Sequence, residues 1–195
     1  MRLLKIYKGM FQYINKKRIY ETAKTAVLFA FAIGLYLIGY ITLKTNKSFW
    51  SIFAVLSVLP AAKSAVNMIM FYKFRSTPLE DYTKIEGVRG KIPVVYDLIF
   101  TTAETSYLVK SAACYDSTVI MLMEPKAKKK QESMNDLKNH IAAAFERDNI
   151  KDFSIKIYSD LGDYCTRLKE MDSKLVKEND RSSDIAFALF NAITL

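Results

Sequence analysis

Three acidic residues and one lysine have the types and order that could support catalysis. Asp97 and Asp116 precede the motif Glu124-Pro125-Lys126. Acidic pairs bind Mg²⁺, and a lysine beside them would lie near the attacking water. One interpretation is therefore a metal-dependent nuclease with Asp97, Asp116, Glu124 and Lys126 as catalytic residues. The alternative is that these are ordinary charges at strand ends, because Pro125 ends a strand and Asp116 falls in an expected turn.

Other motifs that reveal catalytic or metal sites are missing from the sequence. His140 is the single histidine, so it is expected to be a surface or packing residue rather than a metal ligand. The segment Gly87-Val88-Arg89-Gly90 lacks the spacing and the lysine of a phosphate-binding loop. Cys114 and Cys165 are expected to be buried thiols in a reducing compartment rather than a disulfide. The sequence predicts neither a metal site nor a cofactor, apart from the nuclease alternative.

The elements that must position these residues lie in the C-terminal part of the chain. Residues 76–195 have an ordinary soluble composition and predict a cytoplasmic α/β domain. Thr77 and Pro78 suit the N-cap and first position of a helix that ends near Gly87 or Gly90. Three strands of an antiparallel meander, a helix, a strand and two helices are then expected, over residues 92–101, 107–114, 118–123, 131–148, 153–158, 160–177 and from 183 to the end. This order resembles the core of restriction-endonuclease-like nucleases.

Two long apolar segments precede this domain. Residues 26–43 carry no charge, and residues 49–72 are interrupted only by Pro60, Lys63, Ser64 and Asn67. A helix needs about 20 residues to cross a bilayer core of about 30 Å. Because the connection over residues 44–48 is so short, residues 25–75 predict a transmembrane helical hairpin. The expected fold class is an α+β membrane protein, with this hairpin N-terminal to the α/β domain.

The distribution of basic residues predicts the orientation of the hairpin. The formal net charge is +9, and basic residues concentrate before the first span: Arg2, Lys5, Lys8, Lys16, Lys17, Arg18 and Lys24. Charge beside a span indicates topology and attraction to anionic lipid rather than nucleic-acid binding. Both termini of this two-span protein of the cell membrane should then be cytoplasmic. The start of the chain does not have the pattern of a signal peptide.

The residues before the first span have helical periodicity. Residues 1–24 predict a basic amphipathic helix that lies in the cytoplasmic interface of the membrane. The alternative is a cytosolic extension of the first span that packs on the C-terminal domain.

One stripe of the second span carries the polar residues of the hairpin: Ser57, Pro60, Lys63, Ser64 and Asn67. Charged groups within a membrane usually face protein or water. The stripe therefore suggests a packing or oligomer interface. Two alternatives remain, namely that the Lys63 stem reaches the headgroups, or that the stripe lines a conduction pathway.

A pair of small residues in the first span offers a second packing site. Ala30 and Gly34 are four residues apart, a spacing that lets another helix approach closely.

Several short motifs resemble those of a known group of proteins: Leu59-Pro60-Ala61-Ala62-Lys63, Val66-Asn67, Ile69-Met70-Phe71, Asp97-Leu98 and Thr102-x-Glu104. The sequence is similar over residues 18–175 to small uncharacterised two-span membrane proteins of Gram-positive bacteria. Some of these carry the label "O-linked N-acetylglucosamine transferase-like". The resemblance implies a bacterial integral membrane protein and assigns no role to any residue.

Two classes of function follow from these observations. The leading hypothesis is a non-enzymatic sensor, scaffold or membrane effector. Its hairpin forms a homo-oligomer in the lipid bilayer, and its cytoplasmic domain binds a partner or ligand. The alternative is the membrane-anchored nuclease. A pore-forming effector differs from the leading hypothesis only in whether the oligomer encloses a polar lumen.

Overall fold

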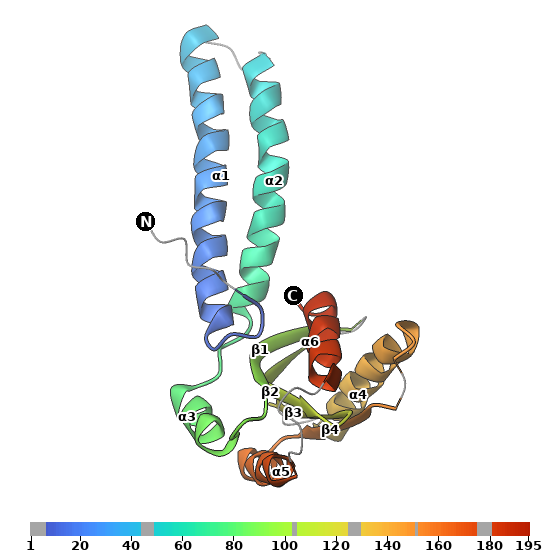
Figure 1. Cartoon of the computed structure of the whole chain (residues 1–195). Coiled ribbons are helices and arrows are strands. Elements are labelled where there is room, and N and C mark those ends of the chain that lie inside the picture. Colours follow the sequence, from blue (N-terminus) through green and yellow to red (C-terminus); the bar gives the residue numbers. More distant parts are fainter. Residues whose placement is uncertain (1–6, 44–48, 103–104, 125–129, 151, 175–180) are drawn as a thin grey trace. The chain divides into compact units, whose positions relative to one another are not determined.

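The structure, a computed structural model, describes residues 7–43, 49–102, 105–124, 130–150, 152–174 and 181–195. The chain divides into two compact units. The helical unit comprises Ile14–Arg75, and the sheet unit comprises Ser76–Leu195 with the described residues that precede Ile14. Figure 1 shows two long helices in the first and a sheet flanked by helices in the second. The protein is therefore α+β, as the sequence predicts.

The helical unit consists of α1 (Tyr13–Leu43) and α2 (Phe49–Tyr72). At 1.5 Å per residue these helices are about 46 Å and about 36 Å long. Both are long and apolar enough to cross a membrane, and most of their large apolar side chains are exposed. The predicted connection over residues 44–48 lies outside the described residues. Pro60 lies inside α2, as the sequence places it.

The segment before α1 differs from the helix predicted over residues 1–24. Residues 7–12 form turns, and the helix begins only at Tyr13. Gly9 has a φ of +82°, a conformation that glycine adopts without strain. A Cβ atom at position 9 would lie 3.1 Å from the Val95 side chain. Gly9 pairs with Tyr96 in an isolated antiparallel bridge, and this long-range contact replaces helix over residues 7–12.

The sheet unit is built on four strands in the order β1-β2-β3-β4. They are β1 (Val94–Thr101), β2 (Ser106–Tyr115), β3 (Thr118–Met123) and β4 (Ser154–Tyr158). The first three form the predicted antiparallel meander, and β4 is parallel to β3. Because a parallel pair needs a crossover, the chain returns through helix α4 (Lys130–Arg147).

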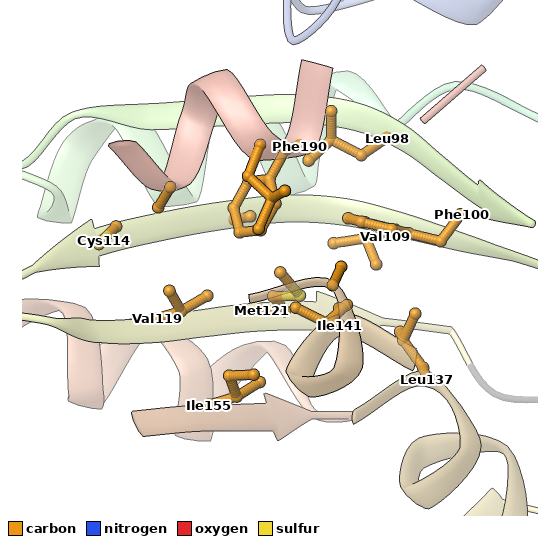
Figure 2. Packing of buried hydrophobic residues seen from close by; sticks show 14 of the residues in the cluster. Leu98, Phe100, Val109, Cys114, Val119, Met121, Leu137, Ile141, Ile155 and Phe190 are labelled. Atoms are coloured by element: carbon orange, nitrogen blue, oxygen red, sulfur yellow. The ribbon is translucent and has the colours of Figure 1, made fainter. Parts of the chain in front are cut away.

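Helices cover the sheet through two separate apolar clusters. The larger cluster packs α4 and α6 (Arg181–Ile193) against the strands, and Figure 2 shows Phe190 and Ile141 among its members. The smaller cluster packs α3 (Leu79–Val88) and α5 (Leu161–Ser173) through residues that include Ile85 and Tyr164. Phe190 is fully buried, so Phe190→Ala would cost about 3–5 kcal/mol. Each predicted helix and strand of this unit is present within a few residues of its expected bounds.

Two details of the sheet unit bear on the expectations from sequence. Helix α3 begins at Leu79 with Pro78 at the N-cap position and without a side-chain cap, so Thr77 is not the predicted N-cap. Its hydroxyl has another partner, described below. Cys114 is buried, as predicted, whereas Cys165 is half-buried, and the two do not form a disulfide.

Candidate functional site

The carboxylates of the nuclease hypothesis do not converge in the structure. Asp97 is buried in β1, whereas Asp116 is exposed at the turn between β2 and β3. Glu124 follows the other end of β3, about 20 Å from that turn at 3.3 Å per strand residue. Lys126 lies outside the described residues. Within the described part of the chain, no group of three or more histidine, cysteine or acidic side chains could hold a metal ion.

Asp97 instead holds the first residues of the sheet unit. Its Oδ1 atom accepts hydrogen bonds from the Thr77 backbone N–H at 2.8 Å and from the Thr77 hydroxyl at 2.7 Å. The same hydroxyl lies 2.9 Å from the Lys110 carbonyl oxygen, and its single proton is shared between the two acceptors. Bonds to a carboxylate are stronger than bonds between neutral groups. Asp97 therefore fixes the chain five residues after α2 ends.

An irregularity of both strands brings Asp97 to this place. Asp97 has a φ of +53° inside β1, and Lys110 opposite it lies where the register between β2 and β3 shifts by one residue. Each strand reverses the faces of its side chains at this point, since Tyr96 and Leu98 belong to different apolar clusters. Residues other than glycine rarely adopt positive φ, and such strain concentrates at functional positions.

Lys110 forms the charged part of this arrangement. Its Nζ atom lies 3.2 Å from Asp81 on α3 and 3.1 Å from Glu124 after β3. Burial by itself would lower the pKa of Lys110, but hydrogen bonds to Glu124 and Asp81 and their negative charges outweigh it and raise the pKa. Lys110 is therefore a cation at neutral pH. It joins α3 and the end of β3 to β2, and it cannot serve as a nucleophile in this state.

The segment that leads into α1 attaches to β1 next to Asp97. The Tyr96 backbone N–H donates to the Gly9 carbonyl at 2.9 Å. Phe11 stacks on Tyr82 of α3, with ring centroids 4.0 Å apart, and meets the Tyr96 ring edge-on. The Tyr96 hydroxyl donates to Glu86 at 2.8 Å. Burial, followed by this bond and the charge of Glu86, raises the pKa of Tyr96.

The same N-terminal segment also binds the C-terminal end of the chain. Lys8 donates to the carbonyl oxygens of Asn191 and Thr194 at the end of α6. A cation at this position complements the negative end of the helix dipole. The Tyr13 hydroxyl donates to the Leu195 carbonyl at 3.3 Å. Residues 8–13 are thus an integral part of the sheet unit.

These contacts define what we call the β1 junction: Gly9, Thr77, Tyr96, Asp97 and Lys110. Gly9 lies four residues before α1 begins, and Thr77 lies five residues after α2 ends. Both segments that connect the helices to the sheet unit are therefore bound to neighbouring residues of one strand. The contacts of the junction attach both connecting segments to β1.

Sequence reasoning found Asp97 but missed the rest of the β1 junction. Thr77 was expected to cap a helix, which is a local role, and the Asp97 contact joins residues 20 positions apart. Lys110 did carry a signal, because it is a charge in the middle of an otherwise uncharged strand. Nothing in the sequence near Gly9 indicates that it pairs with Tyr96.

Within the helical unit, part of the polar stripe of α2 faces α1 and part of it is exposed. Ser64 is buried, and its hydroxyl lies 2.9 Å from that of Thr25 on α1. Lys63 and Pro60 are exposed, and Asn67 is half-buried. The contact with Thr25 places Lys63 level with Lys24 to within about 3 Å along the helices. The two exposed lysines therefore lie at one level of the helical unit.

The predicted packing pair of α1, Ala30 and Gly34, has no close neighbour within the part of the single chain that the structure describes. Ala30 is exposed, and a Cβ atom at Gly34 would meet no other atom within 4 Å. The buried alanines among the described residues of the helical unit are Ala32, Ala54 and Ala61. Close packing at Ala30 and Gly34 thus requires a helix from another molecule, and it stays a prediction.

Comparisons with known proteins leave the chain without an assigned family. No protein-family model matches it, and neither a curated protein nor a solved structure gives a significant match. The similarity to two-span membrane proteins of Gram-positive bacteria therefore stays a prediction. What the chain does must be inferred from its own geometry.

Proposed function

We propose that the chain is a non-enzymatic, two-span membrane protein whose sheet unit binds a partner in the cytoplasm and passes that event to the hairpin. The observation that carries the proposal is the β1 junction. Because Gly9 and Thr77 are both bound to β1, a shift of this strand would move both connections of the hairpin together. A domain attached by one flexible linker would not transmit such a shift.

The charges of the helical unit support insertion into a membrane. Beyond the level of Lys24 and Lys63, α1 continues for 19 uncharged residues, or about 28 Å, and α2 for 14, or about 21 Å. On the other side of this level, Glu21 pairs with Lys17 at 3.3 Å, and Arg18 lies over the Tyr72 ring. A basic belt at one end of an apolar hairpin suits the cytoplasmic headgroups, so both termini are expected to be cytoplasmic.

The remaining part of the proposal is that the hairpin forms a homo-oligomer. Lys63 is exposed in the single chain, and Asn67 beside it is half-buried. Headgroups or the polar groups of a second copy would each relieve the cost of the Lys63 charge. The nuclease alternative lacks a comparable observation, since Asp116 and Glu124 lie at opposite ends of β3.

The test of this proposal compares two cysteine substitutions, Asn46→Cys and Asp180→Cys, each made in the full chain. Position 46 should react with an impermeant thiol reagent in intact cells, while an Asp180→Cys variant should react only after permeabilisation. The chain without an added cysteine reports the background from Cys165. Equal labelling of the two variants would disprove the topology.

The Asn46→Cys variant also tests whether the β1 junction transmits a change between the hairpin and the sheet unit. Cross-linking position 46 between two copies in nanodiscs should change amide hydrogen exchange in residues 76–82 and 94–101. A cross-linked dimer whose sheet unit exchanges like the uncross-linked chain would refute transmission. The uncross-linked variant under reducing conditions is the matched control.

A further inference from the structure

We propose that the groove between α4 and β4 binds an acidic, extended segment of a partner protein, which adds to the sheet as a fifth strand. This inference rests on the proposed function, because it names the site and the chemistry of the partner. Figure 1 shows α4 beside β4 at one side of the sheet unit. Three features of the sheet unit support this inference: the unpaired outer backbone of β4, the shape of the groove and its charges.

Strand β4 is an edge strand with an open side. The Ser154 backbone N–H donates to the Ser117 carbonyl, so the backbone polar groups of Ser154 point toward β3. Those of the alternate residues Ile155 and Ile157 point the other way, to the open side of the sheet. Among the described residues, no backbone hydrogen bond reaches these outward groups. An edge with unpaired N–H and C=O groups is a template for another strand.

The opposite edge of the sheet is already occupied. Strand β1 accepts the N-terminal segment through the bond from Tyr96 N–H to Gly9, and the C-terminus through the bond from Leu195 N–H to Ile99. The segment around Gly9 and the segment around Leu195 thus cover the outer edge of β1. Of the two edges of this sheet, β4 is the one with room for an added strand.

A groove lies along the open edge. One face of α4, with Gln131, Met134, Asn135 and Lys138 at helical spacing, forms one wall, and β4 forms the other. The hollow between them has a volume of about 330 Å³. The half-buried side chains of Met134 and Ile157 offer apolar contacts, and the Gln131 and Asn135 amides offer hydrogen bonds. An extended peptide needs such a combination of a free strand edge and side-chain contacts.

The charges of the groove select the partner. Its charged side chains are Lys138 on α4 and Lys156 on β4, and both are exposed. Lys156 alternates with Ile155 and Ile157, so it flanks the open edge on the face of the sheet that α5 covers, whereas Lys138 flanks the edge on the face that α4 covers. Acidic side chains are absent from the described lining, so a segment with glutamate or aspartate is complementary. A second copy is a poorer occupant. Two β4 strands paired symmetrically about their centre would place Lys156 opposite Lys156, and opposed like charges are destabilising.

The test measures peptide binding by the full chain in nanodiscs of zwitterionic lipid. The probe is a fluorescein-labelled synthetic peptide that alternates glutamate and valine, and fluorescence anisotropy reports binding. Saturable binding of this peptide, with at least about tenfold weaker binding of a lysine–valine peptide, is the expected result. Equal binding of both peptides, or of neither, would overturn the inference.

Charge reversal identifies the site. The variant Lys138→Glu/Lys156→Glu should lose binding of the acidic peptide by about tenfold or more and gain binding of the lysine–valine peptide. Lys169→Glu on the exposed face of α5 is the matched control, and it should leave the affinity unchanged. If the control loses binding as much as the double variant does, net charge rather than the groove explains the effect.

Strand addition has its own readout. The amides of Ile155 and Ile157 should gain protection from hydrogen exchange when the acidic peptide binds. Peptides N-methylated on alternate residues should divide into one that binds and one that does not, because only one edge of the peptide faces β4. Equal binding of both N-methylated peptides would refute the added strand. Peptide binding and membrane topology are measured separately, so failure of one leaves the other to be judged by its own assay.

Discussion

The bond between Thr77 and Asp97 gives the sharpest test of the β1 junction. Thr77→Val keeps the shape and burial of the side chain and removes its hydroxyl, which donates to Asp97 at 2.7 Å. The backbone bond from Thr77 to Asp97 remains. A hydrogen bond to a charged group contributes about 1.5–3 kcal/mol, so we expect a loss of about 2 kcal/mol in the local stability of the junction.

Native-state amide exchange of the full chain measures this loss. A change of about 2 kcal/mol corresponds to about 30-fold faster opening in residues 76–82 and 94–101. Thr83→Val is the control, because the Thr83 hydroxyl is exposed and bonds only to Glu80 within α3. The control is expected to change stability by less than about 0.5 kcal/mol.

Two variants of Asp97 extend the same test. Asp97→Asn keeps an acceptor oxygen and tolerates the positive φ, so it should weaken the junction less than Asp97→Ala does. Asp97→Ala loses both bonds to Thr77 and places alanine at a φ of +53°, which adds about 1–2 kcal/mol. Exchange at the junction that is the same in Thr77→Val, Thr83→Val and the unmodified chain would show that this contact does not hold the connection to the sheet.

The remaining predictions concern the hairpin and the response to pH. Lys63→Leu and Asn67→Leu should each insert at least as well as the unmodified chain and should each shift the oligomer distribution in mild detergent. If size-exclusion chromatography with light scattering finds the same oligomer distribution for both variants as for the unmodified chain, the interface hypothesis is wrong. The sheet unit should lose stability as the pH rises above about 10, because the folded state raises the pKa of Tyr96 and of Lys110 and so favours their protonated forms. Tyr96→Phe should lower stability at pH 8 by about 1 kcal/mol, through loss of the bond to Glu86, and should flatten this alkaline decline in thermal unfolding. A decline of equal steepness in both proteins would show that Tyr96 does not contribute to it.

The residues of the nuclease hypothesis illustrate how order along the chain differs from proximity in the fold. Asp97, Asp116 and Glu124 follow one another in an order that suits a metal site, and the predicted strands are present. Asp116, however, lies in the turn before β3, and Glu124 lies after its end. A six-residue strand separates them, and Lys110 engages Glu124 in an ion pair. Residue order along the chain could not reveal this separation, because the two ends of an extended strand lie far apart even when few residues separate them.

The sequence by itself predicted the positions of the two long apolar helices and of the helices and strands that follow them. Helix and strand periodicities are local, and so are the uncharged runs of α1 and α2, which is why their positions were predictable. The β1 junction was decided only by tertiary structure. The Thr77 hydroxyl donates to Asp97 instead of capping a helix, and Gly9 pairs with Tyr96, which lies 87 positions later in the chain. Such contacts form because folding brings distant backbone groups together, and a buried polar group must find a partner wherever the fold supplies one.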